Sequence, residues 1–149
     1  MVTVDANGNA DGGHFFTKID ESNFYIDDIK YTANQGDLSV TGYNKNFFKG
    51  AAKIINKLVY QGRQLMVKGI AKKAFKECTM LTSITIPNSL KSIGNDVFYK
   101  CYSLTSVTIP NSVTYIDVGA FSYCSSLTDV YCLAESVPWT NPGVGVFDN

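Results

Sequence analysis

The second half of the chain repeats every 23 residues without a gap. Residues 70–92 and 93–115 share 11 identical positions, and residues 116–138 share seven with the second unit. A repeat of this length predicts a solenoid, in which each unit buries its apolar face only against its neighbours. Three phases of the repeat carry like residues: Phe75, Phe98 and Phe121; Cys78, Cys101 and Cys124; Leu81, Leu104 and Leu127.

Each unit contains the pattern of a strand, a turn, a second short strand and a helical or 3₁₀ turn. In residues 81–86 apolar and hydroxyl side chains alternate after one irregular step, which predicts a strand. The Pro-Asn-Ser triplet at 87–89 ends it, because proline fixes φ and short polar side chains favour turns. The spacing of three residues between Phe75 and Cys78 is typical of a helical turn with an inward face. Stacked units then form a parallel sheet.

The formal net charge of zero hides an uneven distribution along the chain. Residues 1–40 sum to −5, residues 41–100 to +9 and residues 101–149 to −4. This pattern, with no recognisable nucleic-acid motif, argues against a nucleic-acid-binding protein and leaves a locally basic middle to be explained. The share of hydrophobic residues, 45% against 17% charged, excludes a disordered chain.

The N-terminal part of the chain contains two predicted hairpins, with turns at 27–28 and 61–62. No run of 18 apolar residues predicts a membrane span, and the first twenty residues lack the pattern of a signal peptide. The sequence predicts one structural domain: a flexible polar leader at 1–14, an antiparallel β-hairpin cap at 15–66, the repeats at 67–138, and a partial C-terminal repeat or cap at 139–149. A poorly capped C-terminal end would allow self-association.

The repeat pattern I-G-x-x-A/V-F-x-x-C-x-x-L-T-S-V-T-I-P-N-S-V resembles the BspA-like (Treponema pallidum-type) leucine-rich repeat family, from residue 70 to about residue 133. The resemblance implies a β-rich solenoid of right-handed coils. It also implies a non-catalytic module at the bacterial cell surface or secreted from the cell. Such a module would act in adhesion by binding a host or cell-surface protein or a glycan.

Two other functions remain open. The units could serve as a structural spacer within a larger surface protein. A glycan-processing accessory domain is a third hypothesis, but the repeats supply only isolated carboxylates such as Asp96, Asp117 and Asp129. Catalysis requires convergent acid, base or nucleophile positions, so we expect no enzyme and no cofactor.

Two surfaces are candidate binding sites. Outward hydroxyls on the predicted strands can hydrogen-bond to a protein or a sugar, although threonine is also simply a good residue for an exposed strand. A group of lysines before the second repeat could meet an anionic partner, although such a group also serves solubility. The candidate strand face comprises Thr82, Ser83, Thr85, Thr105, Ser106, Thr108, Thr128, Asp129 and Tyr131, and the candidate basic flank comprises Lys68, Lys72, Lys73 and Lys76.

Other residues that could carry chemistry are better explained by structure. Cysteines 23 residues apart lack the spacing of metal ligands, so the three repeat cysteines and Cys132 are predicted to be buried thiols. His14 has no recognisable catalytic frame around it. The alternating Asp and Asn residues at 5–11 resemble the start of a calcium loop, but its twelfth position is Phe16, so a polar leader without metal is predicted.

Overall fold

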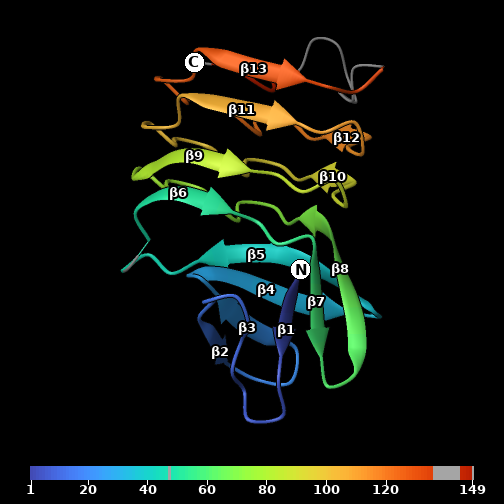
Figure 1. Ribbon diagram of the computed structural model, residues 1–149. Coiled ribbons are helices and arrows are strands. Elements are labelled where there is room, and N and C mark those ends of the chain that lie inside the picture. Colours follow the sequence, from blue (N-terminus) through green and yellow to red (C-terminus); the bar gives the residue numbers. More distant parts are fainter. Residues whose placement is uncertain (47, 136–144, 149) are drawn as a thin grey trace.

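The computed structural model describes residues 1–46, 48–135 and 145–148, and this described part of the chain contains strands and turns but no helix. Figure 1 shows an elongated stack with the N-terminal strands at one end and the last strand at the other. The strands are β1 (Val2–Val4), β2 (Phe16–Lys18), β3 (Asn23–Ile26), β4 (Ile29–Asn34), β5 (Asp37–Tyr43), β6 (Gly50–Lys53), β7 (Lys57–Tyr60), β8 (Arg63–Ile70), β9 (Leu81–Thr85), β10 (Ser92–Ile93), β11 (Ser106–Ile109), β12 (Tyr115–Ile116) and β13 (Asp129–Cys132).

One side of the stack is a parallel sheet in the order β6-β9-β11-β13, visible in Figure 1 as successive levels. β11 pairs in parallel with both of its neighbours, as the stacking of units predicts. Ser106 lies opposite Ser83 on one side and opposite Asp129 on the other, so each step across the sheet is one 23-residue unit. Between the outward positions, Ile84 and Val107 point into the core and are buried.

The opposite side of the stack is formed by shorter parallel pairs. β8 pairs with β5 and with β10, and β10 pairs with β12. These pairs align Val40, Ile70, Ile93 and Ile116, all of which are buried. The core therefore lies between two parallel ladders, and each unit contributes one strand to each.

A column of aromatic rings runs through the core between these two sides. Consecutive ring centroids lie 5.8, 5.5, 5.1 and 5.4 Å apart, and every pair is stacked. Offset stacking adds about 0.5–1.5 kcal/mol per pair beyond the burial of the rings. The column joins units that contact one another only at their interfaces, and its members are Tyr43, Phe75, Phe98, Phe121 and Phe147.

The segment before each strand of the repeat sheet is a run of turns, so the prediction of a helical or 3₁₀ turn is wrong. In residues 71–80, Lys73 and Glu77 have φ of 62° and 59°, and a left-handed residue interrupts a right-handed helix. The amide of Phe75 donates to the carbonyl of Val97 at 3.0 Å, a bond to the next unit that a helix would use internally. The same positive φ recurs at Asp96, Lys100 and Tyr123.

The first strand of the repeat sheet, β6, lies within the segment for which the sequence predicts a cap. Ala52 and Lys53 lie opposite Ile84 and Thr85 of β9. Residues 53–58 (KIINKL) then align with residues 85–90 (TIPNSL) and share Ile, Asn and Leu at three positions. A divergent unit thus precedes the regular ones, and the β7–β8 hairpin follows directly after it.

Both hairpins predicted in the N-terminal part are present. β3 and β4 pair antiparallel around Asp27 and Asp28, which have φ of 50° and 67°. β7 and β8 do so around Gln61 and Gly62, with φ of 50° and 72°. Positive φ at both central residues is the geometry of the type I′ turn, whose twist matches that of the paired strands.

A buried tyrosine connects these hairpins to the first unit. Tyr31 on β4 is fully buried, and its hydroxyl oxygen accepts a hydrogen bond of 3.2 Å from the amide of Ile55. Its ring stacks on that of Phe24 with centroids 6.3 Å apart. The N-terminal strands and the repeats therefore share one apolar core, which is continuous along the chain.

Candidate functional site: the strand face and the basic flank

The strand face, defined as the outward residues of β9, β11 and β13, forms two columns across the repeat sheet. The pairing register sets each residue beside its equivalent in the next unit, so the predicted residues do come together. Ala51 and Lys53 of β6 extend the columns and were missed, because the divergent first unit was not recognised in the sequence. One column holds Ser83, Ser106 and Asp129, and the other Thr85, Thr108 and Tyr131.

The threonines at the start of each strand have a structural role. The hydroxyl of Thr105 donates to the carbonyl oxygen of Thr82 at 3.4 Å, and that of Thr128 donates to the carbonyl oxygen of Thr105 at 3.3 Å. These hydroxyls hold one unit to the preceding one. Because their donor is already used, we place them outside the part of the face that is available to a ligand.

The remaining residues of the face are exposed and sparsely charged. Thr85 and Thr108 are exposed, and the side chain of Tyr131 at the last strand is 57% exposed. Asp129 is the only carboxylate in the two columns, and its Oδ2 accepts a hydrogen bond of 2.7 Å from the Thr128 hydroxyl. Hydroxyls, one carboxylate and an aromatic ring can recognise polar groups, but they do not provide an acid and base pair.

The four lysines of the predicted basic flank divide between two places. Lys68 lies on β8, and its carbonyl oxygen accepts a hydrogen bond of 2.7 Å from the amide of Lys91 in the next unit. Lys72, Lys73 and Lys76 lie instead in the turn segment 71–80. The structure therefore groups three of the predicted lysines and sets Lys68 beside Lys91.

Further residues belong with these three lysines. The ammonium of Lys76 lies 5.0 Å from the centroid of the Tyr99 ring, and that of Lys100 lies 5.3 Å from it. Tyr123 meets the same ring edge-on at 5.3 Å. Lys76 and Tyr99 are 23 residues apart, so the outward phases of the repeat contained the signal, which we had followed only for the inward phases.

The cysteine ladder is part of the core, as predicted. Cys78, Cys101 and Cys124 are buried and free. The thiol of Cys101 donates to the carbonyl oxygen of Phe75 at 3.2 Å, and that of Cys124 to the carbonyl oxygen of Phe98 at 3.1 Å. Burial raises the pKa of Cys78 and of Cys124 to about 11, and it also raises the pKa of Cys101. These thiols stay protonated and serve as spacers between units.

The prediction that Cys132 is buried is wrong. Cys132 lies opposite Ile109 in the sheet, as its phase requires, but it is exposed. Its strand, β13, is the last one in the sheet, and within the described residues no further strand pairs with it. Val130 and Leu133 beside it are 37% and 60% exposed. Phase alone does not bury a residue when no following unit covers it.

The leader residues form ordered turns that hold themselves in place. Asp5 accepts hydrogen bonds of 2.9 Å from the amides of Asn7 and Asn9, and Asp11 accepts one of 2.8 Å from the amide of Thr3. These carboxylates therefore bind the backbone of their own loop. No group of three or more His, Cys, Asp or Glu residues in the described part of the chain is arranged to hold a metal.

His14 contacts the turn of the β3–β4 hairpin. Its Nδ1 is hydrogen-bonded to Oδ2 of Asp27, and the other carboxylate oxygen of Asp27 accepts a bond of 2.9 Å from the amide of Phe15. The pair fixes the leader against the hairpin, and neither residue lies near a nucleophile that it could activate. This arrangement is structural.

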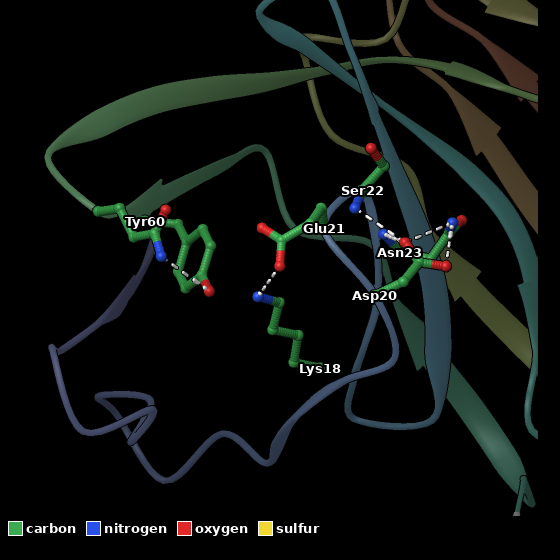
Figure 2. A network of polar contacts seen from close by, with 7 residues as sticks. Lys18, Asp20, Glu21, Ser22, Asn23 and Tyr60 are labelled. Atoms are coloured by element: carbon green, nitrogen blue, oxygen red, sulfur yellow. Dashed lines mark hydrogen bonds and ion pairs between the residues drawn. The ribbon is translucent and has the colours of Figure 1, made fainter.

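A third polar cluster, drawn in Figure 2, closes the turn between β2 and β3. Asp20 accepts bonds from the amides of Ser22 and Asn23 at 2.8 and 2.9 Å, which lowers the pKa of its carboxyl. Lys18 and Glu21 point toward each other and form an exposed ion pair of 2.8 Å. Such a pair contributes little to stability, and the Asp20 oxygens are used by the turn itself, so this cluster offers no site.

The geometry defines a repeat protein of the leucine-rich class, and comparison with known proteins identifies its family. The family model for the BspA type leucine rich repeat region (6 copies) matches residues 41–141, so the chain belongs to that family. The match begins ahead of β6, which agrees with a divergent first unit. No curated protein matches the chain.

Solved structures share the fold. A leucine-rich repeat protein from Bacteroides capillosus is 23% identical with a TM-score of 0.57, covering 75% of this chain and 99% of that one. A leucine rich cell surface protein from Faecalibacterium prausnitzii is 25% identical with a TM-score of 0.60, covering 80% and 32%. The pneumococcal vaccine antigen PcpA is 16% identical with a TM-score of 0.50, covering 80% and 40%. In the residues that the structure describes, no helix is long and apolar enough to cross a membrane.

Proposed function

We propose that this chain is a non-catalytic interaction module of a bacterial surface or secreted protein, and that it binds a host or cell-surface protein or a glycan in adhesion. Leucine-rich repeat domains are in general protein-interaction modules, and the similar protein from Faecalibacterium prausnitzii is described as a cell surface protein. The strand face is the proposed site.

The observation that carries this proposal is the register of the outward residues on the repeat sheet. Thr85, Thr108 and Tyr131 lie opposite one another on neighbouring strands and are exposed. Backbone pairing and buried ladders fix their spacing before a ligand arrives, so binding costs little conformational entropy. A rigid row of hydroxyls that ends in an aromatic side chain suits a polar protein surface or a sugar.

The test is binding of the native protein to an array of extracellular-matrix proteins and glycans. The strand-face variant, Thr85→Arg with Thr108→Arg, is expected to lose at least about tenfold in affinity, because two bulky charges cover the centre of the face. The control variant, Gln64→Arg with Asn111→Arg, adds the same charge at exposed positions away from the face and is expected to bind as the native protein does.

Equal binding by the strand-face variant and the native protein would place the site elsewhere. A native protein that binds no member of the array would favour the alternative of a structural spacer. Turnover of a glycan or peptide, lost in Asp129→Asn, would overturn the non-catalytic assignment.

Self-association through the C-terminal end stays a prediction. The exposed Val130 and Leu133 on the last strand support it, because an apolar sheet edge is a template for pairing with another chain. Sedimentation of the native protein against Val130→Lys checks it, since the lysine blocks edge pairing.

A further inference from the structure

The turn face, defined as the surface of residues 71–80 and 94–103 with the adjoining residues 41–45, carries an arrangement of positive charge distinct from the strand face. Its turn segments are held in register by hydrogen bonds between units. The amide of Lys73 donates to the carbonyl of Asn95 at 2.9 Å, and that of Glu77 to the carbonyl of Tyr99 at 2.7 Å. The side chains on this surface are therefore as regularly spaced as those on the strand face.

A hollow of about 300 Å³ lies on this surface, and three lysines line it: Lys45, Lys73 and Lys76. Glu77 is the one acidic residue among its lining residues. Within the described residues, the ion pairs are His14 with Asp27 and Lys18 with Glu21, so none of the three ammonium groups is neutralised by a salt bridge there. Three unpaired cations around one hollow favour an anion.

Aromatic residues hold this charge in place. The hydroxyl of Tyr43 donates to the carbonyl oxygen of Lys76 at 3.4 Å, and its ring stacks on Phe75, which anchors one wall of the hollow in the core. Lys76 and Lys100 both lie over Tyr99. A cation over an aromatic ring gains about 0.5–1 kcal/mol at an exposed site, which restricts these long side chains before a ligand binds.

The geometry points to a site for a sulfated glycan on the turn face, with one sulfate in the hollow lined by Lys45, Lys73 and Lys76 and a second near Lys100 in the next unit. Neighbouring units are about 4.8 Å apart, so positive charge recurs along the stack. A chain with fixed, permanently ionised sulfates matches such a row. This inference deepens the proposed binding function by naming a ligand for a second surface, and it rests on that function.

Two other polyanions fit less well. A nucleic acid binds such surfaces by stacking bases on aromatic rings, but ammonium groups already lie over the Tyr99 ring. An acidic peptide gains affinity from main-chain hydrogen bonds to a free strand edge. The alternate amides of this surface, at Lys73, Phe75 and Glu77, are already bonded to the next unit. Both polyanions serve as probes in the test.

The test measures affinity for a heparin-derived octasaccharide by calorimetry, beside its desulfated form, polyglutamate and a single-stranded oligothymidine. The turn-face variant is Lys45→Gln, Lys73→Asn and Lys76→Gln; asparagine is chosen because φ at position 73 is 62° and asparagine tolerates that conformation. The control variant, Lys30→Gln, Lys57→Gln and Lys91→Gln, removes the same charge elsewhere. Melting temperatures establish that both variants are folded.

We expect the native protein to bind the sulfated octasaccharide with an affinity that falls as salt rises, and to bind its desulfated form at least about tenfold more weakly. The turn-face variant should lose at least about tenfold, while the control and Lys76→Arg stay within about threefold. The strand-face variant Thr85→Arg with Thr108→Arg should bind the octasaccharide normally, which separates this site from the proposed one.

Three results would overturn the inference. The first is equal weakening in the turn-face variant and the control, which would mean that only net charge matters. The second is tighter binding of polyglutamate or oligothymidine than of the octasaccharide. The third is a native protein that does not bind the octasaccharide at physiological salt.

Discussion

The repeat stack and the N-terminal β region achieve the same degree of burial in opposite ways. In the stack each interaction recurs: Phe98 lies between Phe75 and Phe121, and each ring makes the contact that its neighbours make. In the N-terminal region each contact is made once, as between the Tyr31 hydroxyl and the Ile55 amide. The stack therefore depends on agreement between neighbouring units, whereas the N-terminal region depends on individual residues.

The largest expected effect comes from the middle of the aromatic column. Phe98→Ala removes a fully buried ring that stacks on both sides, and it should lower the free energy of unfolding by about 3–5 kcal/mol. Urea denaturation measures this loss. The control Phe15→Ala, at a side chain that is 81% exposed, should change it by less than about 0.5 kcal/mol. A small effect at Phe98 would contradict the column's role.

The close approach of neighbouring units gives the next effect. A Cβ at Gly94 would lie 2.8 Å from the backbone nitrogen of Lys72 and 3.0 Å from the carbonyl oxygen of Ile70, so Gly94→Ala must separate two units. We expect a loss of about 1–3 kcal/mol, because packed backbone does not yield freely. At Gly42 the nearest atom is 3.8 Å away, and Gly42→Ala should be nearly neutral in the same denaturation assay.

The corresponding test in the N-terminal region is Tyr31→Phe. The change keeps the ring but leaves the buried Ile55 amide without its acceptor, which should cost about 1–3 kcal/mol. Tyr25→Phe, on the half-buried β3 position next along the hairpin, is the matched control. An unchanged unfolding energy in Tyr31→Phe would show that the two regions are not joined by this bond.

A smaller effect distinguishes structural from ligand-binding hydroxyls on the strand face. Thr105→Val removes the bond to the Thr82 carbonyl and should cost about 0.5–1.5 kcal/mol. Thr108→Val should leave the unfolding energy nearly unchanged and weaken binding to the partner instead. The opposite pattern would mean that Thr108 holds the units together and Thr105 faces the ligand.

The smallest effect concerns the thiols. At pH 8, alkylation followed by mass spectrometry should label the exposed Cys132 first and the three buried cysteines only on unfolding. Burial raises the pKa of Cys78 and Cys124 from 9.0 to about 11, so their contribution to stability is full below pH 9 and is lost as the pH rises toward 11. Rapid labelling of Cys101 in the native protein would contradict its burial.

The sequence predicts most of the repeat stack because each unit confirms the phase of the next. The inward positions of Phe75, Cys78 and Leu81 follow from repetition alone, and so does the parallel sheet. The turn segments were misjudged because a three-residue spacing fits both a helical turn and a run of turns. The left-handed residues Lys73 and Glu77 decide between them, and their side chains give no sign of it.

The candidate sites were predictable in part for the same reason. Repetition identifies the two outward columns of the strand face, but it does not show that the Thr105 hydroxyl is bonded to the preceding unit. The hollow on the turn face joins Lys45 from the divergent first unit to Lys73 and Lys76. No periodicity links position 45 to the other two, so only the folded chain brings them together. The division into leader, cap, repeats and C-terminal unit stays a prediction.

The most direct test of the account compares ligand binding by the two regions. The account predicts that binding of the native protein to the array of matrix proteins and glycans is lost when Thr85 and Thr108 become arginine. It predicts that binding is retained when Thr17 and Asn34, exposed residues of the N-terminal β region, are changed in the same way. Loss in the second variant with retention in the first would contradict the central claim that the repeat stack carries the binding site.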